Sequence, residues 1–150
     1  MDQAKRYLDE KCPGGRLAGL KVVPAQRVAE IARLYPWISK QYLQFIADIG
    51  VGNSPLLNIY EPEPLEAVAR DPSYQLYRTP SHVRAFGLLR GGFRLSRDVV
   101  MIADVGAAWR YCLSKKDPSA VFCFDMASGD LMREADGFFH WIDNDLLQQP

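Results

Sequence analysis

The apolar residues of YPWISKQYLQFIADIG, residues 35–50, recur with the period of an α-helix. Four of them are spaced i, i+3, i+4 and i+7 and therefore share one helical face: Tyr42, Phe45, Ile46 and Ile49. A helix with such a stripe buries it against the rest of its domain. The pattern predicts a core helix, with Phe45 buried against a sheet.

The residues around this stripe predict where the helix begins and ends. Pro36 biases the residue before it away from the helical conformation, so a preceding helix should stop near Tyr35. Ser39 can cap the next helix, because its hydroxyl can accept a hydrogen bond from a free backbone N–H. Gly50 suits the left-handed residue that follows a helix C-terminus.

The segment before Pro36 has the same period. In AQRVAEIARLY the apolar positions form a second helical face: Val28, Ile31, Ala32 and Tyr35. Upstream, CPGGRLAGLKVVP is interrupted by Pro and Gly, and we expect a loop there after a short amphipathic start. Two helices should therefore pack as a pair before Gly50.

After the turn residues GVGNSP the pattern becomes that of strands. LLNIY is the first run, and five short runs rich in Val, Ile and aromatic residues follow: VRAFGLL, VVMIA, AWRYCL, AVFCFD and DLMRE. Most of their connections are too short for a crossover helix, which favours antiparallel neighbours. Between LLNIY and VRAFGLL only a short helix over residues 65–70 is predicted, since four prolines punctuate the segment: Pro62, Pro64, Pro72 and Pro80.

The segment GFFHWIDNDLL near the C-terminus returns to the helical period. Its apolar face consists of Phe138, Phe139, Ile142 and Leu146, and Asp136 is the predicted N-cap. The order of helices, strands and helix predicts an α+β fold. We expect an antiparallel meander sheet of about five to six strands, with helices from the N- and C-terminal ends packed against it.

Composition fits one soluble domain over residues 1–150. The chain is 48% hydrophobic and 24% charged, as expected of a globular protein. No apolar run approaches the ~18 residues of a membrane span, and the start MDQAKRYLDEKC is charged where a signal peptide would be apolar. Cys12, Cys112 and Cys123 have no CxxC spacing, which favours a reducing compartment over a disulfide framework or zinc site. We expect a cytoplasmic location.

The net charge of zero is distributed in blocks along the chain. Residues 1–40 carry +4 (8 basic, 4 acidic), 41–81 carry −3 (2 and 5), 82–124 carry +4 (7 and 3) and 125–150 carry −5 (1 and 6). The sequence pI of about 6.7 weighs against direct nucleic-acid binding. Segregated charge suits a protein partner, although solvated faces that balance by chance account for it equally well.

The candidate chemical groups do not form a known catalytic motif. His82 and His140 have no second ligand at metal spacing, and Asp143 and Asp145 point in different directions on a helix. Cys112 could serve as a nucleophile, but it lies inside an apolar strand pattern. The glycines of LLRGGFR lack a following GK[ST] and fit a hairpin turn. We therefore assign no catalytic residue, metal ligand or cofactor.

Three stretches together resemble the SUKH superfamily. PWISKQYLQFIADIGVG resembles its opening, in which a proline precedes a helix that carries Tyr and Phe and ends in a small-residue turn. VVMIADVGAAWRYCL is similar to the family's strand, turn and aromatic strand. AVFCFDMASGD with ADGFFHWIDNDL is similar to its last strands and terminal helix. The resemblance covers roughly residues 24–147.

This resemblance implies a noncatalytic bacterial immunity protein that binds and neutralises a cognate toxin in the cytoplasm. It leaves open a regulatory scaffold or adaptor role, because other members of the superfamily act as scaffolds. A small hydrolase that uses Cys112 is a third alternative. As a binding protein, the chain would be a monomer or weak homodimer without a metal, cofactor or membrane anchor.

The residues predicted to bind the partner are those typical of interface centres. Tyr, Trp and Arg provide large contact area or several planar donors. Outside the predicted helices they gather in two places: Tyr60, Tyr74 and Tyr77 in the proline-punctuated region, and Arg84, Arg94, Arg97, Trp109 and Arg110 on or between the middle strands. We expect both groups to border one surface, although for Trp109 packing against the second face of the sheet is slightly favoured.

Overall fold

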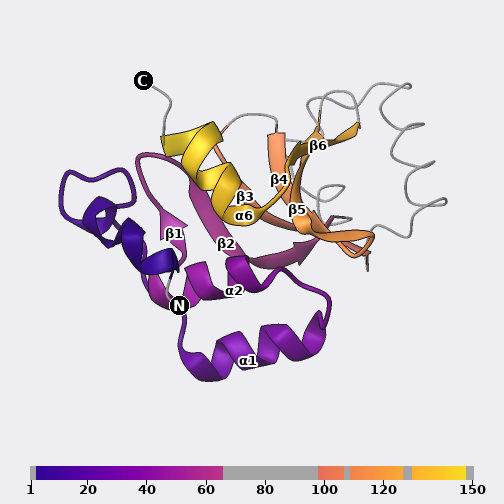
Figure 1. Cartoon of the computed structure of the whole chain (residues 1–150), viewed down its shortest axis with the longest axis horizontal. Helices are drawn as coiled ribbons and strands as arrows, with labels where there is room; N and C mark the ends of the chain where they lie inside the picture. Colours follow the sequence, from indigo (N-terminus) through magenta and orange to yellow (C-terminus); the bar gives the residue numbers. More distant parts are fainter. Residues whose placement is uncertain (1–2, 66–97, 107–108, 127–129, 148–150) are drawn as a thin grey trace.

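The computed structural model describes residues 3–65, 98–106, 109–126 and 130–147. Their strands form one six-stranded antiparallel sheet whose spatial order follows chain order (Figure 1). The strands are β1 Gly52–Asn53, β2 Asn58–Pro64, β3 Val99–Asp104, β4 Trp109–Ser114, β5 Asp117–Asp125 and β6 Leu131–Ala135. The predicted α+β class with an antiparallel meander is confirmed.

The strands differ from the sequence prediction in several places, and β1 Gly52–Asn53 lies within GVGNSP, which was predicted to be a turn. β2 runs from Asn58 to Pro64 and includes Pro62 and Pro64, although the predicted strand ended at Tyr60. The prolines are tolerated because β1 pairs only with Asn58 and Ile59, and a register shift separates Ile59 from Glu63. β5 begins at Asp117 rather than Ala120, since the tight turn after β4 pairs Ser114 with Asp117. The predicted strand VRAFGLL and residues 66–70 of the predicted helix lie outside the described residues.

The two faces of the sheet belong to different hydrophobic clusters. Along β3, Val100 and Ile102 join the larger cluster, which also contains the helices, whereas Val99 and Met101 join a smaller one. Side chains alternate between faces along a strand, so the two clusters lie on opposite sides of the sheet. We call them the helix side and the second side.

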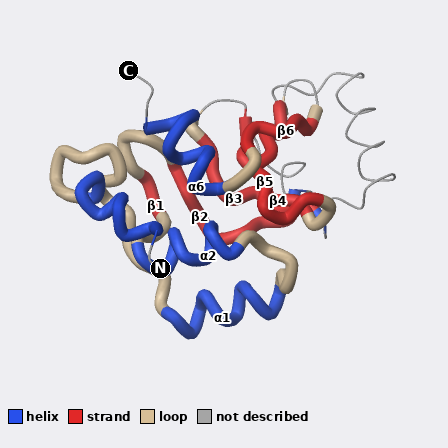
Figure 2. The backbone as a smooth tube through the Cα atoms, viewed as in Figure 1, coloured by secondary structure: helices blue, strands red, loops and turns tan. Residues whose placement is uncertain are grey.

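Three helical elements precede the sheet: the 3-10 helix η1 Gln3–Lys11 and the α-helices α1 Ala25–Leu34 and α2 Lys40–Asp48. Figure 2 shows α2 against the strands and α1 further out. The Ser39 side chain accepts a hydrogen bond from the Tyr42 backbone N–H, as predicted for an N-cap. All four residues of the predicted apolar stripe are buried, with Phe45 fully inaccessible to solvent. These predictions are confirmed.

Gly50 follows α2 with a φ of +122°, as its predicted position required. The next residue, Val51, forms a two-hydrogen-bond bridge with Lys21, each N–O distance being 2.9 Å. A Cβ at position 50 would lie 2.3 Å from the Lys21 carbonyl carbon and oxygen. Glycine is therefore needed both for the backbone conformation and for the close approach of the loop before α1.

The terminal helix consists of a short α-helical turn, α6 Phe138–His140, that continues as the π-helix η3 Trp141–Leu147. Its position confirms the predicted terminal helix, but Asp136 does not cap it: Gly137 is the N-cap residue and makes no side-chain capping bond. The Asp136 carboxylate instead accepts from Arg133 at 3.0 Å. Gln41 of α2 accepts the Phe139 backbone N–H, so a distant helix supplies the missing acceptor.

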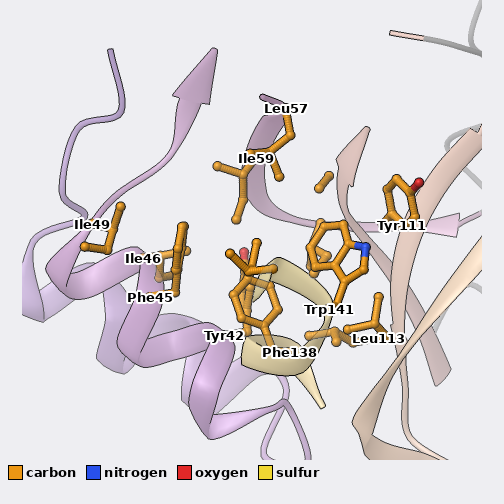
Figure 3. Close-up of a cluster of buried hydrophobic side chains, with 14 of the residues drawn as sticks. Tyr42, Phe45, Ile46, Ile49, Leu57, Ile59, Tyr111, Leu113, Phe138 and Trp141 are labelled. Atoms are coloured by element: carbon orange, nitrogen blue, oxygen red, sulfur yellow. The ribbon is translucent and has the colours of Figure 1, made fainter. Parts of the chain in front are cut away.

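The core lies between α2, the terminal helix and the helix side of the sheet (Figure 3). The Phe138 ring packs on Phe45 at 5.3 Å and on Tyr42 at 5.7 Å between ring centroids. Trp141 packs on Tyr111 of β4 at 4.7 Å. The stripe predicted on α2 therefore packs against Phe138 of the predicted terminal face, whose Phe139 and Ile142 are buried too. Trp141, which was not part of the predicted face, is also fully buried.

Candidate functional site

Trp109, the first residue of β4, is a large aromatic side chain that remains 47% exposed. β4 lies between β3 and β5 in the sheet, and Trp109 is directly opposite Asp125 of β5. Paired strands fix the position of a side chain better than a loop does. The exposed indole is therefore held in place before any partner arrives.

Met132 of β6 lies on the same face of the sheet as Trp109 and is 56% exposed. Tyr111 pairs with Cys123, and Cys123 pairs with Met132, so these three side chains project to one side. Trp109 is two residues from Tyr111 on β4 and therefore projects to that side as well. Tyr111 and Cys123 belong to the cluster on the helix side, which identifies the face.

The terminal helix covers one part of this face and not the other. Tyr111, against which Trp141 packs, is only 7% exposed. Trp109 and Met132 lie next to this covered part and remain open to solvent. The helix side thus ends in an apolar surface that the described helices do not bury.

Two acidic residues lie near the apolar ones: Asp125 is directly opposite Trp109, and Glu134 is two residues after Met132 on β6. Burial and the carboxylates of Glu134 and Asp125 together raise the pKa of the Cys123 thiol to about 11. We define the Trp109 patch as Trp109, Asp125, Met132 and Glu134.

The structure separates the residues that were predicted to bind a partner together. Tyr60 and Arg110 lie on the second side, where Tyr60 packs against the smaller cluster. Burial raises the pKa of the Tyr60 phenol, and the nearby Arg110 charge partly opposes this shift. Trp109 projects to the other side, because adjacent strand residues alternate. The remaining predicted residues lie outside the described part of the chain: Tyr74, Tyr77, Arg84, Arg94 and Arg97.

Tyr60 and Arg110, one from each predicted group, therefore share a side of the sheet, whereas Trp109 does not lie on a common surface with them. Sequence reasoning also missed Met132, Asp125 and Glu134. Strand alternation would have separated Trp109 from Arg110, but only the pairing register shows that Met132 is two strands away on the same face. The expectation that Trp109 packs the second face is wrong too, since the residue is half exposed on the helix side.

Cys112, the candidate nucleophile, is fully buried in the smaller cluster. Its thiol donates to the Arg110 carbonyl oxygen at 3.6 Å. Burial raises the pKa of this thiol well above its ordinary value, so the reactive thiolate is disfavoured. His140 is exposed on α6 and contacts Asn144. The geometry therefore fits the prediction that Cys112 acts as a small buried hydrophobe.

A shallow groove of about 330 Å³ lies between the segment that joins α1 to α2 and the start of β5. Its lining combines apolar rings with a few polar groups: Pro36, Trp37, Ile38, Ser39, Lys40, Gln41, Pro118 and Ser119. The Trp37 ring packs edge-on against Tyr35 at 6.0 Å. Trp37 is only partly buried, so the groove wall retains an accessible indole.

Within the described residues, no three His, Cys, Asp or Glu side chains gather as metal ligands. None of the helices in this part of the chain is long and apolar enough to cross a membrane. Comparison with known proteins gave no match to a family model, a curated protein or a solved structure.

Proposed function

We propose that this chain is a noncatalytic immunity-type protein that binds a cognate toxin domain and neutralises it in the cytoplasm. The observation that supports the proposal is the exposed Trp109 indole on β4, which shares a face of the sheet with exposed Met132 on β6. Tryptophan in the centre of an interface contributes more binding energy than most residues. An aromatic anchor held by a sheet loses little freedom on binding, which favours affinity.

The resemblance to the SUKH superfamily supplies the class of partner, and the Trp109 patch supplies the surface. Inhibition would be stoichiometric, because a binding protein neutralises a toxin only by occupying it. The burial of Cys112 supports this function over the Cys-dependent hydrolase, since a nucleophile must reach its substrate as the thiolate. The scaffold or adaptor role remains the competing outcome.

Co-expression with the toxic domain encoded beside this gene tests the proposal. We expect the parent chain to protect the host and to form a stoichiometric complex with that domain. Trp109→Ala should weaken the affinity by at least ~1–2 kcal/mol without changing the melting temperature appreciably. Leu34→Ala is the matched control, because Leu34 is an exposed apolar residue on α1 (64% exposed), away from the patch.

Protection that is lost with Trp109→Ala and retained with Leu34→Ala would support the proposal. Binding to a housekeeping protein without protection from any toxic neighbour would favour the adaptor role. A hydrolase activity that is lost in Cys112→Ser, while the variant still folds, would overturn the proposal that the protein is noncatalytic.

A further inference from the structure

The groove between the α1–α2 connection and the start of β5, here called the Trp37 groove, is lined by a buried hydroxyl with an unused donor. Ser39 is only 5% exposed, and its side-chain oxygen accepts the Tyr42 backbone N–H. A serine hydroxyl can also donate one hydrogen bond. Within the described residues, no acceptor receives the Ser39 proton. An acceptor placed in the groove would therefore satisfy it.

The two residues that follow Ser39 in the groove wall are donors as well. Oε1 of Gln41 accepts the Phe139 N–H at 3.0 Å, so the amide NH2 group carries the remaining hydrogen-bonding capacity of this side chain. The Lys40 ammonium is exposed, and no carboxylate in the described part of the chain pairs with it. None of the described residues that line the groove is acidic. The groove thus offers donors from three consecutive residues, one of them charged.

The rest of the groove wall consists mainly of rings. Pro36 on one side and Pro118 on the other are both exposed. The half-buried Trp37 ring is supported edge-on by Tyr35 at 6.0 Å. Aromatic and proline rings also line the grooves that bind extended, proline-containing peptides. Because the groove is shallow, with a volume of about 330 Å³, it suits a few side chains of an extended segment better than an enclosed small molecule.

We propose that the Trp37 groove binds an extended acidic segment of a partner protein. An Asp or Glu side chain of that segment accepts hydrogen bonds from the donors of Ser39, Lys40 and Gln41, and a neighbouring proline or apolar side chain packs on Trp37. Charge complementarity selects this occupant, because a carboxylate both satisfies the donors and pairs with the Lys40 ammonium.

This site is separate from the Trp109 patch. Pro118 follows Asp117, which pairs with Ser114 at one end of the β4–β5 hairpin, whereas Trp109 pairs with Asp125 at the other end. The inference therefore goes beyond the proposed function and does not depend on it.

Selection from a phage-displayed library of random dodecapeptides, with the purified parent chain as the target, tests the inference. We expect the selected peptides to carry Asp or Glu beside a proline or apolar residue. One such peptide is then synthesised with an acetylated N-terminus and an amidated C-terminus, so that a terminal carboxylate cannot replace the acidic side chain. Replacing its acidic residue by the matching amide should weaken binding at least about tenfold in calorimetry, and high salt should weaken binding of the acidic peptide.

Variants of the protein locate the binding site. Lys40→Glu and Gln41→Glu should each weaken binding of the acidic peptide at least about tenfold, because they place a carboxylate among the donors. Both should retain the fold, since acidic residues are favoured in the first turn of a helix and Gln41→Glu still accepts the Phe139 N–H. Lys21→Glu is the control: it makes the same charge change at an exposed lysine that bridges Val51, beyond the other end of α2.

The outcomes separate this inference from the proposed function. Selected peptides that are basic or uncharged, or a selection that yields no binding peptide, would overturn it. It would also be overturned if the acidic peptide bound Lys40→Glu and Trp37→Ala as tightly as the parent, or if Lys21→Glu weakened binding as much as Lys40→Glu does. Trp109→Ala should leave the peptide affinity unchanged, and a loss there would place the peptide on the Trp109 patch and overturn the inference. Absence of protection from a toxic domain would overturn the proposed function alone.

Discussion

The side-chain oxygen Oε1 of Gln41 lies 3.0 Å from the backbone nitrogen of Phe139 and accepts its hydrogen bond. This bond joins α2 to the terminal helix across 98 positions of sequence. The first backbone N–H groups of a helix have no partner within the helix, and a side chain normally satisfies one of them. Here the partner comes from another helix rather than from Asp136.

Gln41→Ala should therefore lower the free energy of unfolding by about 1 kcal/mol, because the Phe139 N–H loses its acceptor. Gln41→Glu should retain most of the stability, since a carboxylate accepts the same bond and is favoured near a helix N-terminus. Asp136→Ala should cost less, as it removes only an exposed contact with Arg133. Urea denaturation of the three variants checks the order, and a larger loss for Asp136→Ala would contradict it.

Gly50 and Gly106 allow the effect of close approach to be separated from that of backbone conformation. Both have positive φ, at +122° and +83°, but a Cβ on Gly106 would meet nothing within 4 Å. Gly106→Ala should cost about 1–2 kcal/mol through its backbone conformation. Gly50→Ala should cost clearly more, because the Lys21 backbone must also move. Equal melting temperatures for the two variants would show that the Lys21 backbone moves without a measurable loss of stability.

Phe45 is the central residue of the aromatic cluster that joins α2 to both ends of the chain. Its ring lies 5.8 Å from Tyr7 and 5.3 Å from Phe138, measured between centroids. Phe45→Ala should lower the free energy of unfolding by about 3–5 kcal/mol, because it leaves a cavity between these rings. Leu34→Ala, at an exposed position, should change it little. A Phe45→Ala variant that melts within a degree or two of the parent would refute the burial.

Stability should fall as the pH rises from about 9 towards 11. Burial and the carboxylates of Glu134 and Asp125 raise the pKa of Cys123 from 9.0 to about 11. The unfolded chain loses this proton first, so the folded state holds more protons in that window and loses stability with increasing pH. Below pH 9 the Cys123 thiol is protonated in both the folded and the unfolded state, so its full contribution to stability remains.

Denaturant unfolding at pH 8 and pH 10.5 measures this effect in the parent and in Cys123→Ala. The variant should lose less stability between the two pH values, while Cys12→Ala, which removes an exposed thiol, should behave like the parent. Other buried groups also destabilise the protein at high pH, but the parent and both variants share them. Parallel losses in the parent and Cys123→Ala would contradict the raised pKa.

Much of the fold could be predicted from local patterns in the sequence. The spacing of Tyr42, Phe45 and Ile46, with a capping serine before them, predicted α2 because apolar periodicity and capping depend on nearby residues. Short strand-like runs with short connections predicted the antiparallel meander, since such connections leave few alternatives. The positive φ of Gly50 followed from its place after a helix.

The fold class, the principal helices and the residues of the core stripe could thus be predicted, because local periodicity, capping and short connections indicate them. That Gln41 rather than Asp136 accepts the hydrogen bond of the terminal helix could not be predicted, since this contact spans 98 positions. Only the tertiary structure decided that Trp109 shares a face with Met132 and not with Arg110, because a face is set by strand register and alternation together. A surface assembled from three strands has no signature in any one of them.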